Sequence, residues 1–108
     1  MRLLSLKSGR LSLEFVPQEL PLVRSRLAVA ARKGRVPARI VQQPGATHDV
    51  VSVRGMEFIL LSELGEHALI STSLTGDILL RRVARDVGRT AIRARRRQFR
   101  RELIQQAA

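Results

Sequence analysis

The chain has 108 residues and a formal net charge of +11, from 20 Lys and Arg against 9 Asp and Glu. The absence of cysteine excludes disulfides, thiolate catalysis, thiolate zinc sites and iron–sulfur clusters. Three aromatic residues are too few for the base-stacking platform of an RRM or OB-fold protein. An apolar content of 44% is typical of a globular chain, and the length predicts one domain spanning residues 1–108.

The first third of the chain predicts a β-hairpin followed by a short helix. Apolar and polar residues alternate over 1–16 around a turn at 7–10, and this excludes the unbroken apolar run of a signal peptide. The apolar side chains of the two strands are Leu4, Leu6, Leu11, Leu13 and Phe15. Over 17–34 the apolar spacing changes to three and four residues, which predicts a helix with Pro21 in its first turn and Gly34 at its C-cap.

The middle of the chain predicts further strands. The sequence predicts a strand over 36–41 that ends at the turn-forming sequence Gln-Gln-Pro-Gly. Apolar residues alternate in three runs over 49–74, which predicts a meander that bends at Gly55 and Gly65. The run over 56–64 is also compatible with two helical turns capped by Gly65, because periodicity does not separate strand from helix in so short a segment.

A long amphipathic helix is the clearest predicted element. Asp77, or Thr75 just ahead of it, is suited to accept the free N–H groups at its start, and the helical pattern continues to about residue 106. The sequence therefore predicts an α+β fold with a small, mostly antiparallel sheet formed by the hairpin and the meander, and one short helix. In this prediction a body of residues 1–76 continues into a basic helix over 77–106.

Arginines form a stripe along this predicted helix. At about 100° per residue, six of them fall within an arc of about 80°: Arg82, Arg85, Arg89, Arg93, Arg96 and Arg100. The opposite side carries Leu80, Val83, Ala84, Val87, Ala91 and Ala94. The stripe spans about 27 Å of helix, enough to follow several phosphates. We expect the apolar side to face the core and the arginines to face a partner.

The concentration of charge favours nucleic acid as that partner. Residues 77–108 hold ten arginines and three acidic residues, a net charge of +7. Ordinary solvated helix faces mix charge signs four residues apart, whereas only Asp86 can bridge within this stripe. A guanidinium binds two phosphate oxygens at once. We therefore predict that DNA or RNA binds to the stripe together with Arg97 and Arg101. The alternative interpretations are an acidic protein partner, a solvated face kept for solubility, and an arginine bias that reflects codon usage.

Two further groups of residues predict contacts. A second basic region at the end of the short helix either extends the polyanion surface or interacts with the helix dipole: Arg24, Arg26, Arg32, Lys33, Arg35 and Arg39. Near the end of the long helix, Ile92, Phe99 and Leu103 share another arc, away from the apolar side. This patch predicts a contact with a partner, such as a second copy of the chain, in preference to a minor core cluster.

Catalysis has little support in the sequence. His48 and His67 are the only side chains suited to general-base catalysis near neutral pH, and neither has the spacing of a metal site. No phosphate-binding loop or nucleophile elbow occurs. We therefore predict a non-enzymatic nucleic-acid-binding protein without metal or cofactor. A small basic ribonuclease is the enzymatic alternative.

An assembly role is the alternative from another class of protein. A structural subunit, for example of a phage particle, would form a homo-oligomer or dock on its neighbours through the C-terminal helix. No apolar run approaches the length of a membrane span, so we expect no membrane partner. The expected location is the cytoplasm or the inside of an assembled particle.

Overall fold

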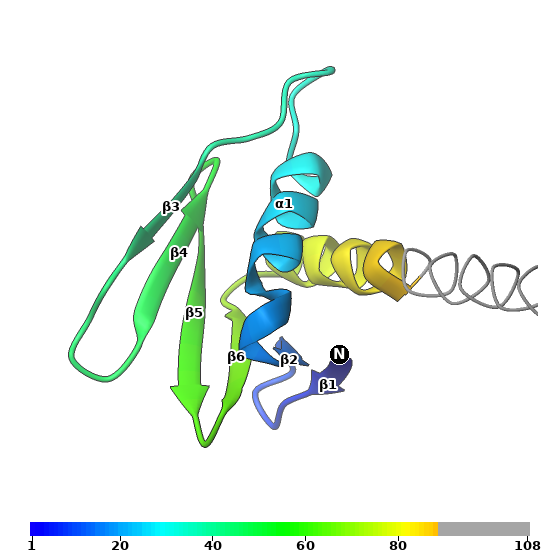
Figure 1. Ribbon diagram of the computed structural model, residues 1–108. Helices are drawn as coiled ribbons and strands as arrows, with labels where there is room; N and C mark the ends of the chain where they lie inside the picture. Colours follow the sequence, from blue (N-terminus) through cyan, green and yellow to red (C-terminus); the bar gives the residue numbers. More distant parts are fainter. Residues whose placement is uncertain (89–108) are drawn as a thin grey trace, which may run out of the picture.

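A six-stranded antiparallel sheet and two α-helices form residues 1–88, the part of the chain that the computed structural model describes (Figure 1). Both helices pack against the same face of the sheet. The α+β class predicted from the sequence is thus confirmed. None of the helices within the described residues is long and apolar enough to cross a bilayer.

The N-terminal hairpin forms as predicted, but the predicted alternation of its first strand is wrong. Leu3 faces the core, Leu4 lies opposite Ser12 on the other face, and Leu6 lies outside the strand. Strand β1 covers Arg2–Ser5 and strand β2 covers Leu11–Phe15, and the two are antiparallel with Leu3 opposite Leu13. The turn between them contains Gly9 at a φ of 87°, a conformation that glycine adopts without steric cost. Leucine side chains from both strands therefore lie on one face of the hairpin.

Helix α1 covers Leu20–Ala30 and follows a 3-10 turn at Pro17–Glu19. The Glu19 carboxylate accepts the Val16 N–H at 3.1 Å, so one donor at the entrance of the helical segment is satisfied. Pro21 lies in the first turn of α1, as predicted, where its missing N–H removes no hydrogen bond.

The segment after α1 differs from the prediction at two points. Gly34 is not the C-cap of the helix; it lies in a separate tight turn, with a φ of 61°, closed by hydrogen bonds between Lys33 and Val36. Strand β3 covers Ile40–Gln43, whereas the sequence predicts a strand over 36–41.

Hydrogen bonds of Gln42 explain the position of β3. Its Oε1 accepts a hydrogen bond from the Arg24 guanidinium at 3.1 Å, and its Nε2 donates a hydrogen bond to the Asp49 carboxylate at 2.8 Å. These contacts with α1 and with the next strand hold Gln42 in the sheet, although its sequence neighbours are typical of a turn. The strand ends just before Pro44, which has no N–H to donate to a ladder.

The predicted meander is formed by three strands, β4 at Asp49–Val53, β5 at Met56–Glu63 and β6 at Glu66–Ser71. Its two bends are two-residue turns that end in Gly55 and Gly65, and both residues of each turn have a positive φ. Turns of this kind match the twist of antiparallel strands. The ambiguous run over 56–64 is therefore a strand and not a helix.

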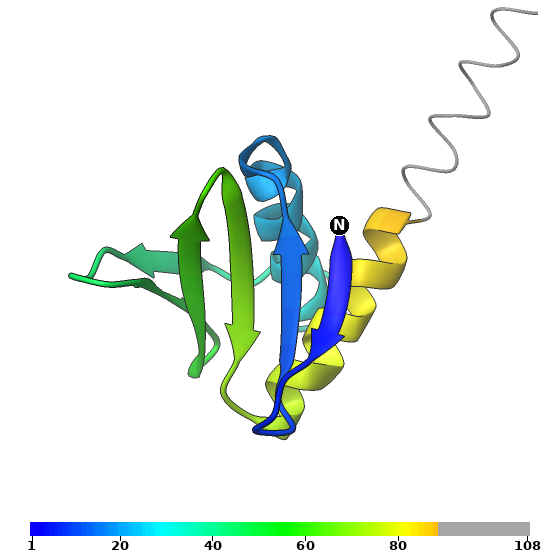
Figure 2. The same ribbon diagram turned by 90° about the horizontal axis from the view of Figure 1, so that it is seen from below.

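The hairpin and the meander join into one sheet through β2 and β6. These strands are antiparallel, with Leu13 opposite Leu69, and the strand order is β1-β2-β6-β5-β4-β3. Figure 2 shows the strands side by side with both helices behind them. The sequence predicts each half of the sheet but contains no local signal for this junction.

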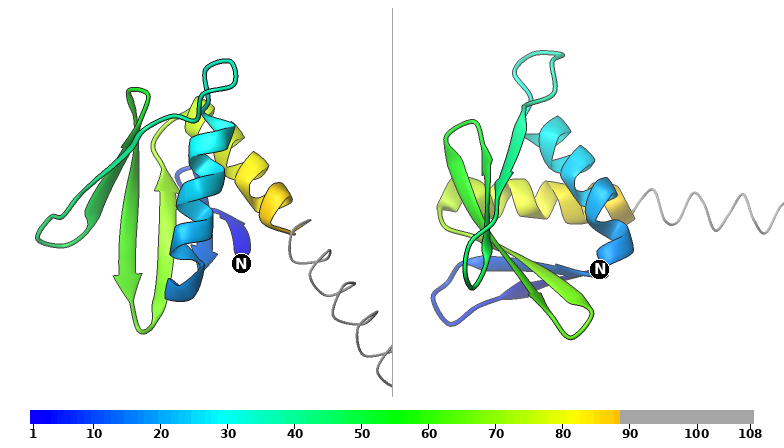
Figure 3. Two further views of the ribbon diagram at one scale, coloured as in Figure 1. Left: turned by 45° about the horizontal axis from the view of Figure 1, so that its top comes forward. Right: turned by 60° about the vertical axis from the view of Figure 1, so that its left-hand side comes forward.

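The core lies between the sheet and the two helices (Figure 3). Phe58 of β5 and Leu27 of α1 are each 0% exposed. The other buried apolar residues of the core are Leu11, Leu13, Phe15, Val23, Ala31, Val51, Val53, Leu60, Leu69, Leu79, Leu80, Val83 and Val87. No element of residues 1–88 covers the opposite face of the sheet, here called the open face.

Candidate nucleic-acid interface

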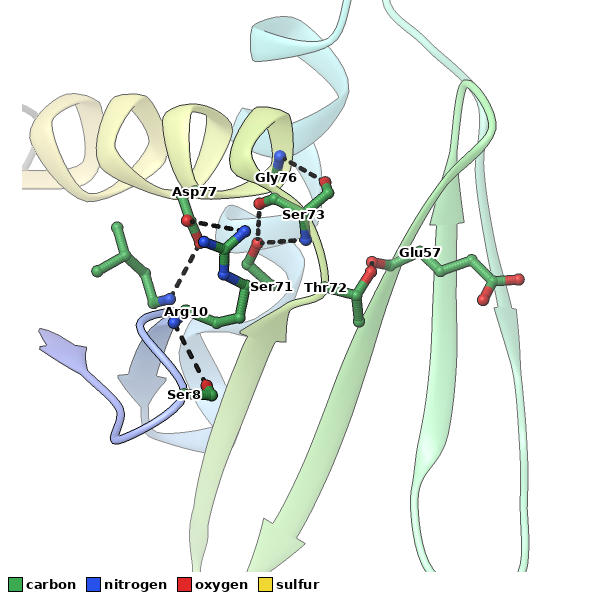
Figure 4. Close-up of polar contacts among 9 residues, drawn as sticks. Ser8, Arg10, Glu57, Ser71, Thr72, Ser73, Gly76 and Asp77 are labelled. Carbon is green, nitrogen blue, oxygen red and sulfur yellow. Dashed lines mark hydrogen bonds and ion pairs between the residues drawn. The ribbon is translucent and has the colours of Figure 1, made fainter.

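Within residues 1–88, the helix on which the arginine stripe is predicted covers residues 74–88. Its N-cap is Ser73, whose hydroxyl accepts the Gly76 N–H at 3.0 Å (Figure 4). The prediction of Thr75 or Asp77 as the N-cap is wrong, because both residues lie inside the helix. Since all three are capping residue types, their identity alone does not decide among them.

Close packing at Gly76 fixes the first turn against the sheet. A Cβ atom at this position would lie 2.6 Å from the Ser71 Oγ and 3.3 Å from a ring carbon of Phe58. The Ser71 hydroxyl in turn donates to the Ser73 carbonyl at 2.7 Å. The helix therefore starts as close to β5 and β6 as a residue without a side chain allows.

Asp77 links the helix to the N-terminal hairpin. It is 5% exposed, its Oδ1 accepts the Leu11 N–H at 3.0 Å, and its Oδ2 lies 3.6 Å from the Arg10 guanidinium (Figure 4). Burial raises the pKa of this carboxyl, but the hydrogen bond from the Leu11 N–H, the nearby Ser71 hydroxyl dipole and nearby arginine charges lower it by more. The pKa therefore lies below its usual value, and the charged carboxylate fixes the helix on the sheet.

The described part of the helix has the two faces that the sequence predicts. Leu80, Val83 and Val87 are buried and Ala84 is partly buried, whereas Arg81, Arg82 and Arg85 are exposed. The Arg85 guanidinium lies 3.8 Å from the Asp86 carboxylate, but its side chain is 59% exposed. This solvated pair is weak and leaves the guanidinium accessible to another anion.

Most of the predicted site lies beyond this part of the helix. The residues outside the described range are Arg89, Arg93, Arg96, Arg97, Arg100 and Arg101, and the predicted partner contact formed by Ile92, Phe99 and Leu103. Only Arg82 and Arg85 of the predicted arginines are therefore described.

The second basic region lies at the C-terminal end of α1. Its exposed members are Arg32, Lys33, Arg35 and Arg39, while Arg24 and Arg26 are partly buried. Arg54, from the turn between β4 and β5, donates to the carbonyls of Ala31 and Arg32 at 3.3 and 3.4 Å. Arg54 thus adds a cation beside this region and satisfies carbonyls that follow α1, a role that was not predicted from the sequence.

Acidic residues gather on the open face. The strand registers place Glu14, Glu57, Glu63 and Glu66 there, and the Arg2 guanidinium pairs with Glu14 at 2.6 Å. The two helices that carry arginines lie on the other side of the sheet. This placement of the glutamates was not predicted from the sequence, although glutamates of one parity at both ends of β5 are its local signal.

The two histidines make local hydrogen bonds. His48 Nδ1 lies 2.9 Å from the Thr47 hydroxyl, and His67 Nδ1 lies 2.7 Å from the Ser62 hydroxyl. The His67 ring also packs against Phe15, with 5.5 Å between the ring centroids. Within residues 1–88, no three His, Cys, Asp or Glu side chains are grouped so that they could hold a metal ion.

The exposed arginines on the last helix and the exposed cations at the end of α1 are thus two parts of the described surface with a chemistry suited to anions. Comparison with known proteins adds no further constraint, because no family model, curated protein or solved structure matches the chain.

Proposed function

We propose that the protein binds DNA or RNA without catalysing a reaction, and that the arginines of its last helix hold the phosphates. The observation that carries the proposal is the one-sided placement of Arg81, Arg82 and Arg85 on a helix whose other side is buried. Because the helix is anchored through Asp77 and capped by Ser73, these guanidiniums are presented from a rigid support. Little backbone order has to be created when they bind phosphate.

The distribution of charge supports one orientation of the complex. A polyanion would be attracted to the helix side and repelled by the glutamates of the open face. The predicted stripe continues in the sequence through Arg89, Arg93, Arg96, Arg97, Arg100 and Arg101. A nucleic acid that follows the helix axis would therefore meet further guanidiniums, and the basic end of α1 extends the same side.

The proposed contacts are mainly with phosphates, so affinity depends strongly on salt and weakly on sequence. Each neutralised phosphate releases condensed counterions, and the slope of log affinity against log salt is about −0.9 per phosphate on duplex DNA. If about six phosphates are neutralised, the slope is near −5. A protein that binds through a few specific base contacts would give a shallower slope.

Fluorescence anisotropy with labelled duplex DNA and structured RNA, titrated at several salt concentrations, tests the proposal. The test variant is Arg82→Gln/Arg85→Gln, because glutamine keeps helix propensity. The control variant is Arg2→Gln/Lys7→Gln, which removes the same two charges from the N-terminal hairpin. We expect the test variant to bind severalfold more weakly and to lose about 2 from the magnitude of the slope. The control variant should stay close to the unmodified protein.

Three results would contradict the proposal: no binding at low salt, a slope near zero, or equal losses in the test and control variants. A second variant, Arg89→Gln/Arg93→Gln/Arg96→Gln, extends the test to the stripe beyond residue 88 and should lose more affinity than the first. Cleavage of the RNA that disappears in His48→Ala or His67→Ala would instead indicate a ribonuclease.

A further inference from the structure

The open face of the sheet is apolar at its centre and acidic around it. Its partly buried apolar side chains are Leu4, Val50, Ile59, Leu61, Ala68 and Ile70. A hollow of about 320 Å³ lies over β2, β5 and β6, and its walls include Leu61, Ile70, Glu14, Glu63 and Glu66. An apolar surface bordered by carboxylates is suited to a partner that is both apolar and cationic.

The glutamates at one end of this hollow form no direct ion pair with the described residues. Glu63 and Glu66 lie directly opposite each other at the end of the β5–β6 hairpin, where like charges destabilise a strand pair. Neither carboxylate lies within ion-pair distance of a cation among residues 1–88. The Arg2 guanidinium interacts with Glu66 at longer range, but its direct partner is Glu14. Cations supplied by a partner would relieve this repulsion.

Residues 89–108 have the matching chemistry. They contain seven arginines and one acidic residue, a net charge of +6. In the predicted helix, Ile92, Phe99 and Leu103 share an arc, and Arg95 and Arg96 fall on either side of it, within about 40° of its edges. A narrow apolar strip between arginines would complement an apolar sheet face between glutamates.

The charges and the topology favour this segment from another molecule. Two open faces would not pair with each other, because their glutamates would meet. The helix over 74–88 lies on the other side of the sheet from the open face, and the sequence predicts that it continues without a break. The described end of this helix, at residue 88, therefore lies on the other side of the sheet from the open face of its own chain.

We propose that the open face binds residues 89–108 of a second copy of the chain. The strip formed by Ile92, Phe99 and Leu103 packs on the apolar centre of the sheet, and Arg95 and Arg96 pair with Glu63 and Glu66. This contact needs no nucleic acid, so it can be tested separately from the proposed binding to phosphates, although Arg96 belongs to both proposals.

A charge exchange between two full-length chains tests the contact. The face variant is Glu63→Arg/Glu66→Arg, and the tail variant is Arg95→Glu/Arg96→Glu. Sedimentation velocity at low salt, on protein freed of nucleic acid, measures association of each variant, of their equimolar mixture, and of a chain that carries all four changes. Circular dichroism and thermal melting check that each chain folds, and Glu63→Gln/Glu66→Gln serves as a milder face variant.

The unmodified chain should associate, and each double variant should raise the dissociation constant at least about tenfold. The mixture should associate again, because the arginines of the face variant then meet the glutamates of the tail variant. The chain with all four changes should regain self-association for the same reason. The proposal is wrong if the unmodified chain is a monomer at every concentration tested, if the folded face variant associates as strongly as the unmodified chain, or if the mixture of folded variants stays monomeric. A folded fourfold variant that sediments as a compact monomer would indicate that the segment binds the open face of its own chain. That result would also contradict the proposal.

Discussion

At the scale of single residues, Asp77 decides how the last helix sits on the sheet. Its carboxylate accepts the Leu11 N–H and lies beside Arg10, so it joins segments that are far apart in the sequence. We expect Asp77→Asn to lower the free energy of unfolding by about 1–2 kcal/mol at pH 7, because the amide keeps an acceptor for Leu11 but loses the charge beside Arg10. Urea unfolding of both proteins measures the difference, and equal midpoints at pH 7 would contradict this role.

The same carboxyl predicts a dependence of stability on pH. Its pKa is lower in the folded protein than in the unfolded chain, where it is about 3.9, so folding favours the charged form. The contribution is fully present above the unfolded pKa and is lost as pH falls through the folded pKa. We therefore expect the stability difference between Asp77 and Asp77→Asn to be constant from pH 7 to about pH 5 and to shrink below about pH 4. A difference that grows on acidification would have the wrong sign.

Two glycines in the last helix should respond in opposite ways to the same substitution. Gly76→Ala places a Cβ atom 2.6 Å from the Ser71 Oγ, whereas Gly88→Ala meets no atom within 4 Å. Alanine favours a helix over glycine by up to about 1 kcal/mol, so Gly88→Ala should be neutral or stabilising. At Gly76 the clash outweighs this gain, and we expect a loss of about 1–3 kcal/mol. Thermal melts of the two variants provide the comparison, and a stabilised Gly76→Ala would show that the first helical turn is not tightly packed.

At the scale of elements, the sequence predicts the strands and helices whose formation depends on the local pattern of apolar residues and turns. The hairpin, α1, the meander and the buried side of the last helix each follow from apolar spacing and from turns such as Gly55 and Gly65. The errors occur where contacts distant in sequence decide the outcome. Gln42 belongs to a strand because Arg24 and Asp49 bind it, and no nearby residue indicates this.

The N-cap of the last helix illustrates the same limit. Ser73 and Asp77 are both suited to cap a helix, and the choice depends on a helix start that packs Gly76 against Phe58 and Ser71. The pairing of β2 with β6 is likewise a nonlocal contact, so alternation within each strand does not reveal it. The candidate site was predictable in part, since the exposure of Arg82 and Arg85 follows from helical periodicity alone.

At the scale of the whole molecule, the net charge conceals a concentration of glutamates on the open face. The value of +11 suggests a uniformly cationic surface, but the open face carries four glutamates beside a single arginine, Arg2. The sequence did not predict this arrangement, because it requires β2, β5 and β6 to be neighbours. In a molecule with this distribution of charge, an arginine-rich segment has two kinds of partner: a polyanion, or the acidic open face of another copy.

If both proposals hold, nucleic acid and the open face compete for the same arginines. Glu63→Gln/Glu66→Gln should then raise the affinity for DNA severalfold, because residues 89–108 are no longer held by a second copy. Removing two negative charges also strengthens long-range attraction to DNA, but that effect does not depend on protein concentration. We therefore expect the gain at concentrations where the unmodified chain associates and its decline on dilution. Anisotropy titrations at two protein concentrations separate the two causes, and an equal gain at both would mean that charge alone, without competition, accounts for the effect.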